Sequence, residues 1–80
     1  MNFDMDELTT LLTDIRPGQD YSKADDFFNQ GLLDSLDMTT LVAALESKYG
    51  IFLDVDEIVP DNLKSLSAIR SLLARKGVNV

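Results

Sequence analysis

The chain has 80 residues, fourteen acidic and seven basic, and its net charge at pH 7 is −7. Nucleic acids and anionic membrane surfaces attract basic proteins, so we expect neither as a partner. The absence of cysteine and histidine excludes disulfides, thiol nucleophiles, histidine acid–base catalysis and the usual zinc sites.

The first residues, MNFDMDEL, lack the basic and apolar regions of a signal peptide, and no apolar run reaches membrane-spanning length. We therefore expect a cytoplasmic protein, folded as a single domain over residues 1–80. We expect a monomer, because the helical pattern leaves no apolar face over.

Apolar residues at helical spacing predict a first helix over residues 4–15: Leu8, Leu11, Leu12 and Ile15. Acidic residues fill its first turn, where the helix dipole favours them, and Arg16-Pro17-Gly18 ends it. Residues 17–33 predict a long loop, in which Ser22 and Asp25 have the spacing of a helix cap. Five apolar side chains are expected to hold this loop to the core: Tyr21, Phe27, Phe28, Leu32 and Leu33.

The second helix is predicted to follow Asp34 as N-cap, with Asp37 as its capping-box partner and Gly50 as a left-handed C-cap. Residues 54–59 predict one or two helical turns that Pro60 ends.

The last helix is predicted to start at Ser65 and to close at Gly77. The fold class is therefore all-α. We expect a small antiparallel helical bundle of three main helices, with a short helix before the last and a long first loop.

The chain contains no catalytic set of side chains, and we expect neither an enzyme nor a metal site. The segment with suggestive chemistry is GLLDSLD, Gly31 to Asp37. Ser35 would stand in the first turn of a helix, beside unpaired backbone N–H groups that suit a phosphate ester. On spacing alone, the favoured interpretation is a serine that only caps the helix.

The segment from Phe27 to Ala74 resembles the acyl carrier protein superfamily, which includes the peptidyl carrier domains. The resemblance rests on GLLDSLD and on a downstream pattern in register: Leu41, Ala44-Leu45-Glu46, Tyr49-Gly50-Ile51 and Ser65-Leu66-Ser67-Ala68-Ile69. It implies a free-standing carrier whose Ser35 receives 4′-phosphopantetheine from coenzyme A, through a phosphopantetheinyl transferase that uses Mg²⁺. The thiol of that arm would hold an acyl or aminoacyl cargo as a thioester.

The resemblance also implies a surface for partner enzymes. Asp34 would assist the metal site of the transferase, with a plain N-cap as its alternative. Leu36 would face the transferase and later partners, with buried packing as its alternative. Acidic residues would form a rim for basic partners, although such runs are also typical of a solvated face: Asp34, Asp37, Glu46, Asp56 and Glu57. Four apolar residues are interpreted as core rather than as the lining of a cargo pocket: Leu41, Leu45, Ile58 and Ile69.

The second helix is less acidic than in the carriers of fatty acid synthesis. It has Thr39, Thr40, Ser47 and Lys48 on the corresponding face, with only Asp37 and Glu46 retained. We therefore favour an aminoacyl or specialised acyl carrier, served by an adenylating ligase and by downstream acyl-processing enzymes, over a housekeeping fatty acid carrier. An unmodified acidic helical adaptor is a rival interpretation, and an acidic mimic of nucleic acid is a weaker one.

Overall fold

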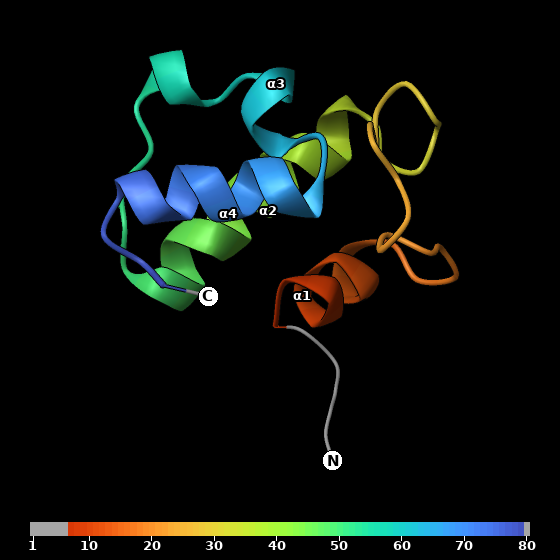
Figure 1. Cartoon of the computed structure of the whole chain (residues 1–80), viewed down its shortest axis with the longest axis horizontal. Coiled ribbons are helices and arrows are strands. Elements are labelled where there is room, and N and C mark those ends of the chain that lie inside the picture. Colours follow the sequence, from red (N-terminus) through yellow and green to blue (C-terminus); the bar gives the residue numbers. More distant parts are fainter. Residues whose placement is uncertain (1–6, 80) are drawn as a thin grey trace.

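The computed structural model describes residues 7–79, which form four α-helices and one 3₁₀ turn (Figure 1). The elements are α1 (Glu7–Ile15), α2 (Ser35–Tyr49), the 3₁₀ turn η1 (Val55–Glu57), α3 (Pro60–Leu63) and α4 (Leu66–Arg75). No strand occurs in this range, and the predicted all-α fold with its long first loop is confirmed. The one or two helical turns predicted over residues 54–59 form the single 3₁₀ turn η1, and α3 was not predicted. Of the predicted first helix, positions 4–6 lie outside the described residues.

The core is made by one apolar stripe from each of the three longer helices. Helix α1 packs against α2, and α3 packs against α4. Full burial of such an aliphatic side chain stabilises the fold by about 1.5–3 kcal/mol, so this stripe holds the helices together. Nine residues of the longer helices are buried: Leu8, Leu11, Leu12, Leu41, Val42, Leu45, Ile69, Leu72 and Leu73. The core interpretation of Leu41, Leu45 and Ile69 is confirmed, and Ile58 packs against the same cluster while only partly buried.

The loop between α1 and α2 is held to the core, as its apolar residues predicted. Tyr21 and Phe27 are buried against each other, with ring centroids 5.3 Å apart in an edge-to-face arrangement. The Phe27 N–H donates to the carbonyl of Lys64 at 2.7 Å, which ties the loop to the junction of α3 and α4. Leu33 is also buried, while Phe28 and Leu32 are partly buried. These contacts of the loop therefore fix the position at which α2 starts.

Two local predictions were wrong. Pro60 does not end a helix; it stands at the first position of α3, where its missing N–H costs no hydrogen bond and its fixed φ suits the helix. Ser22 does not pair with Asp25; its N–H and hydroxyl both donate to Asp20 Oδ1. The turn that follows is capped instead by Asp26, whose Oδ1 accepts from the N–H groups of Phe28 and Asn29.

The predicted boundaries of the longer helices are largely confirmed. Gly50 ends α2 with φ of 64°, a left-handed conformation that glycine adopts without steric cost. Ser65 Oγ accepts from the Ala68 N–H at 3.0 Å and so caps α4. Among residues 7–79, none of the helices combines the length and the apolar character needed to cross a lipid bilayer.

Candidate functional site

Ser35 is the first residue of α2, and the turn that holds it is fixed by its two acidic neighbours. Asp34, extended at φ −117° and ψ −173°, is the N-cap: its Oδ1 accepts from the Asp37 N–H at 2.9 Å. Asp37 Oδ2 accepts in return from the Asp34 N–H at 3.1 Å. These bonds complete the predicted capping box, which satisfies two backbone donors that the helix itself cannot pair. The hydrogen bond from the Asp37 backbone lowers the pKa of Asp34, so this carboxylate stays ionised.

The capping box leaves the hydroxyl of Ser35 without a structural task. Ser35 is exposed, and within residues 7–79 no side-chain hydrogen bond involves its Oγ. The interpretation of Ser35 as the helix cap was therefore wrong, because Asp34 fills that role. The hydroxyl lies in the first turn of a fifteen-residue helix, where backbone N–H groups lack intrahelical partners. Of the first-turn N–H groups, that of Asp37 already donates to Asp34 Oδ1 and that of Met38 to the Asp34 carbonyl. The hydroxyl is thus reachable by another protein and lies at the positive end of the helix dipole, which favours an anion.

Arg16 joins this turn to the end of α1. Its Nε donates to Asp37 Oδ2 at 2.8 Å, and its Nη2 lies 3.4 Å from Asp34 Oδ2. The side chain of Asp37 is only 13% exposed, so this guanidinium supplies the charge that compensates it. The same hydrogen bond from Arg16 to Asp37 raises the pKa of Arg16 further above its ordinary value. The buried Tyr21 hydroxyl donates to the Arg16 carbonyl and holds its backbone.

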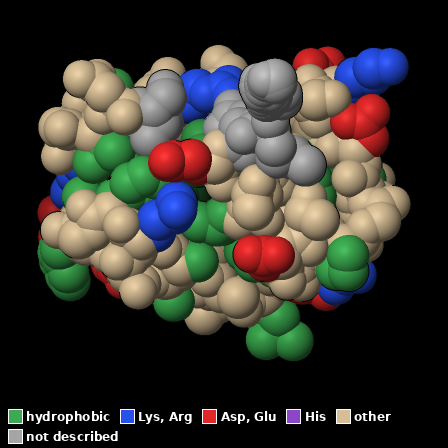
Figure 2. Space-filling model, turned by 90° about the horizontal axis from the view of Figure 1, so that it is seen from below, with side chains coloured by type: hydrophobic (Ala, Val, Ile, Leu, Met, Phe, Trp, Pro, Cys, Tyr) green, Lys and Arg blue, Asp and Glu red, His purple; other side chains and the backbone are tan. Residues whose placement is uncertain are grey.

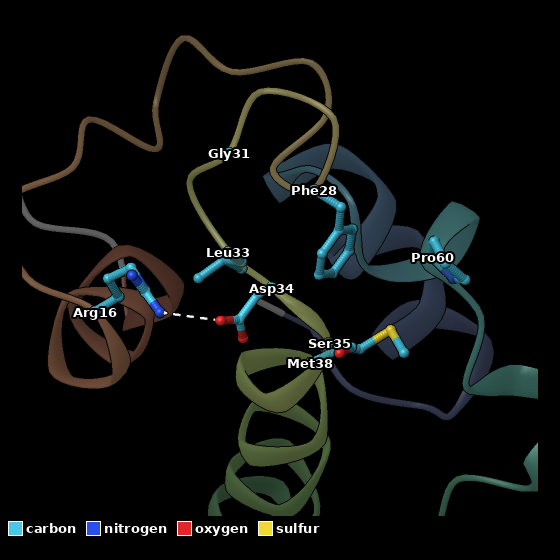
Figure 3. A pocket seen from close by; sticks show the side chains of 8 residues that line it. All are labelled: Arg16, Phe28, Gly31, Leu33, Asp34, Ser35, Met38 and Pro60. Atoms are coloured by element: carbon cyan, nitrogen blue, oxygen red, sulfur yellow. Dashed lines mark hydrogen bonds and ion pairs between the residues drawn. The ribbon is translucent and has the colours of Figure 1, made fainter.

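A pocket of about 460 Å³ opens beside Ser35 (Figure 3). Figure 3 shows Arg16 on one side of Asp34 and Ser35 on the other, next to Met38. Eight residues of the loop, α2 and the start of α3 line the pocket: Arg16, Phe28, Gly31, Leu33, Asp34, Ser35, Met38 and Pro60. Four of these side chains are apolar, and Arg16 and Asp34 are the two charged ones. The four residues predicted as core, Leu41, Leu45, Ile58 and Ile69, do not line it.

Leu36, next to Ser35, is 77% exposed. The alternative of buried packing was therefore wrong: the helix turns this leucine outward while Leu41, five positions later, is fully buried. Three further large apolar residues are exposed in the segment between α2 and α3: Phe52, Val55 and Val59. Figure 2 shows one face of the molecule, on which hydrophobic side chains reach the surface between charged ones. An exposed apolar side chain next to an exposed hydroxyl, as Leu36 is to Ser35, is typical of a surface that other proteins contact.

The structure separates the predicted acidic rim into two groups. Asp34 and Asp56 are exposed, and the side chain of Asp34 is 60% accessible even with its cap bond formed. The other three carboxylates are engaged within the chain: Asp37 with Arg16, Glu46 with the Leu53 N–H at 2.9 Å, and Glu57 with Lys76 at 2.7 Å. The bond from Lys76 lowers the pKa of Glu57.

Sequence reasoning missed Arg16, Phe28, Met38 and Pro60 as neighbours of Ser35. Arg16 was noted only where it ends a helix, and the eighteen positions from Arg16 to Asp34 carry no signal that the two would meet. The Arg16–Pro17 pair predicts only that the chain leaves α1 at that residue, and not where the Arg16 side chain then lies.

Comparisons with known proteins agree on one family. The sequence profile of the family described as "phosphopantetheine attachment site" matches residues 6–73, most of the chain. A curated relative, an "acyl carrier protein homolog" of Mycoplasma genitalium, is 42% identical over 50 residues. That match covers 58% of this chain and 57% of the relative. No solved structure gives a significant match.

Proposed function

The chain belongs to the phosphopantetheine-attachment family of carrier proteins, and on that premise we propose that Ser35 is the residue that carries the arm. In the attachment reaction, Ser35 Oγ would form a bond to the phosphorus of coenzyme A that bears the pantetheine. The bond from that phosphorus to the adenosine bisphosphate part would break, and the hydroxyl proton would leave to a base on the transferase. The product is a phosphodiester on Ser35.

The observation that carries this proposal is that Asp34, and not Ser35, caps α2. Asp34 provides the cap, and the adjacent hydroxyl is exposed with no side-chain partner among the described residues. An anion attached there would lie at the positive end of the α2 dipole, which favours negative charge. The arm's pantetheine part would leave Ser35 beside a pocket with an apolar lining. The residues present therefore fit a phosphopantetheine group.

When attached, the arm supplies a terminal thiol that can hold an acyl or aminoacyl group as a thioester. The chain's own residues hold the arm and present it to partners. Asp34 fixes the turn and supports the transferase's metal site, while Leu36 enters the contact with the transferase and later enzymes. Asp56 and Asp34 supply exposed charge for basic partners.

We infer further that the cargo is an aminoacyl or specialised acyl group, loaded by an adenylating ligase. The support is the surface of α2. Helix α2 itself contains two carboxylates. Asp37 is bound to Arg16, and Glu46 is bound to the backbone N–H of Leu53. What α2 presents to solvent is largely uncharged: Thr39, Thr40, Ala43 and Ser47, with Lys48. Enzymes that recognise a strongly acidic second helix would find little charge here.

The attachment is tested by intact mass. The purified protein is incubated with coenzyme A, Mg²⁺ and a promiscuous phosphopantetheinyl transferase, beside Ser35→Ala and Ser47→Ala. Ser47 is a matched control, because it is an exposed serine on the same helix. We expect one phosphopantetheine on the native chain and on Ser47→Ala, and none on Ser35→Ala. A folded native chain that gains no mass with several transferases would instead favour an unmodified adaptor.

The cargo is tested separately on the modified protein. Loaded with a malonyl group, it is offered to the enzymes of fatty acid synthesis; loaded with an amino acid by candidate adenylating ligases, it is followed by mass. We expect aminoacyl loading and poor elongation. Efficient elongation of the malonyl form would contradict the aminoacyl proposal and leave the carrier proposal intact.

A further inference from the structure

Arg16 is the basic residue of the Ser35 pocket, and its two ion-pair contacts differ in strength. The bond from its Nε to Asp37 is 2.8 Å, whereas its Nη2 lies 3.4 Å from Asp34, beyond the usual range for such a pair. We propose that Arg16 is the binding residue for the phosphodiester on Ser35. On modification, its Nη2 exchanges Asp34 for a phosphate oxygen while its Nε stays on Asp37. The inference rests on the proposed modification of Ser35.

The charge of the site favours this exchange. Asp34 and Asp37 together carry two negative charges, and Arg16 offsets one of them. A phosphodiester on Ser35 adds a further negative charge next to Asp34. Arg16 is the one lysine or arginine among the eight residues that line the pocket. The new anion and the exposed Asp34 therefore compete for one guanidinium, and the phosphate matches the planar donor fork of arginine.

The geometry allows the exchange without loss of the turn. Asp34 caps α2 through its Oδ1, whereas Arg16 contacts its Oδ2, so the cap does not depend on the contact that is given up. Arg16 is 43% exposed, which leaves its outer nitrogens room to move. Its inner part is held by Asp37 and, through the backbone carbonyl, by the buried Tyr21. Figure 3 shows Asp34 between Arg16 and Ser35, so the guanidinium has to pass from one residue to its neighbour in the chain.

The test is a cycle of four proteins: native chain and Arg16→Gln, each unmodified and carrying phosphopantetheine, unfolded with denaturant at low salt. Gln keeps a polar side chain but removes the cation. We expect Arg16→Gln to lower the folding equilibrium constant about threefold more in the modified than in the unmodified protein, as for an exposed ion pair. In about 1 M salt, where charges are screened within about 3 Å, the ratio of the effect in the modified protein to that in the unmodified protein should fall from about three toward one.

Lys48→Gln is the matched control, because it removes one exposed positive charge thirteen positions further along the chain from Ser35. It should affect both forms equally. Should Arg16→Gln not fold, NMR of the native protein gives a second readout. On modification, the Nη resonances of Arg16 should shift more than that of Nε, and the ³¹P resonance should differ between the native chain and the variant.

The outcomes separate the two proposals. Failure of the native chain to gain the arm's mass would refute modification of Ser35, and the inference with it. A modified protein with equal effects of Arg16→Gln in both forms, and with a ³¹P resonance unchanged by the substitution, would overturn the role of Arg16 alone.

Discussion

The exposure of Leu36 leads to a prediction that separates stability from function. Complete burial of a leucine side chain contributes about 1.5–3 kcal/mol. Because Leu36 is 77% exposed, the fraction already buried accounts for only about 0.3–0.7 kcal/mol of that range. We therefore expect Leu36→Ala to lower the free energy of unfolding by less than about 0.7 kcal/mol. Leu41→Ala, on the same helix but fully buried, should lower it by about 2–5 kcal/mol.

The same substitution should impair modification. If the transferase covers the exposed part of Leu36, its removal forfeits about 1–2 kcal/mol of contact, or about five- to thirtyfold in kcat/KM for attachment at Ser35. Stability is measured by denaturant unfolding followed by circular dichroism, and attachment by the rate of mass gain. Phe52→Ala is the control, since Phe52 is also exposed but lies beyond the far end of α2.

Two results would refute this reasoning. Equal destabilisation by Leu36→Ala and Leu41→Ala would mean that Leu36 packs into the fold. Unchanged stability together with an unchanged attachment rate would mean that the transferase does not contact this side chain.

Three further predictions concern the scaffold. Gly50→Ala forces an alanine into φ of 64° and should cost about 1–2 kcal/mol of unfolding free energy, although no atom lies within 4 Å of the added Cβ; Gly50→Asn should cost less, and equal losses would argue against backbone strain. Burial, followed by the bond to Glu7, raises the pKa of Tyr49 from 10.0 to about 12, so the folded state keeps a proton that the unfolded chain loses. Stability should therefore fall from about pH 10 to pH 12, and a Tyr49→Phe variant that shows the same fall in denaturant unfolding would contradict this. Lys76 lowers the pKa of Glu57 below 4.5, so the contribution of this pair is present above that pH and is lost as the pH falls through the lowered value; Lys76→Gln should flatten the acid side of the stability curve.

Much of the fold follows from local sequence signals. Apolar residues at helical spacing place the three longer helices, because a helix must bury one continuous stripe. The cap residues Asp34, Gly50 and Ser65 set helix ends through bonds within a few residues of themselves. Local signals also misled at Pro60, because a proline can either end one helix or begin the next. Which of the two occurs depends on the packing of α3 against α4.

The candidate serine was also visible in the sequence, but its role was not settled there. A serine beside an aspartate at a helix start fits a cap as well as an attachment site. The helix can use only one cap, and the structure gives it to Asp34, which leaves the Ser35 hydroxyl exposed. The direction of Leu36 was open for a similar reason, since a residue in the first turn can face the core or the solvent.

The sequence by itself thus determined the three longer helices and their order, the apolar stripes that they bury and the turn that contains Ser35. These features depend on residues close together in the chain. Only the tertiary structure decided what surrounds that turn. Arg16 donates a hydrogen bond to Asp37, 21 positions later in the chain. Phe28, which precedes α2 in the sequence, and Pro60, which follows it, line the same pocket. Contacts of this kind are set by how the loop and the helices pack, and the spacing of residues along a helix carries no record of them.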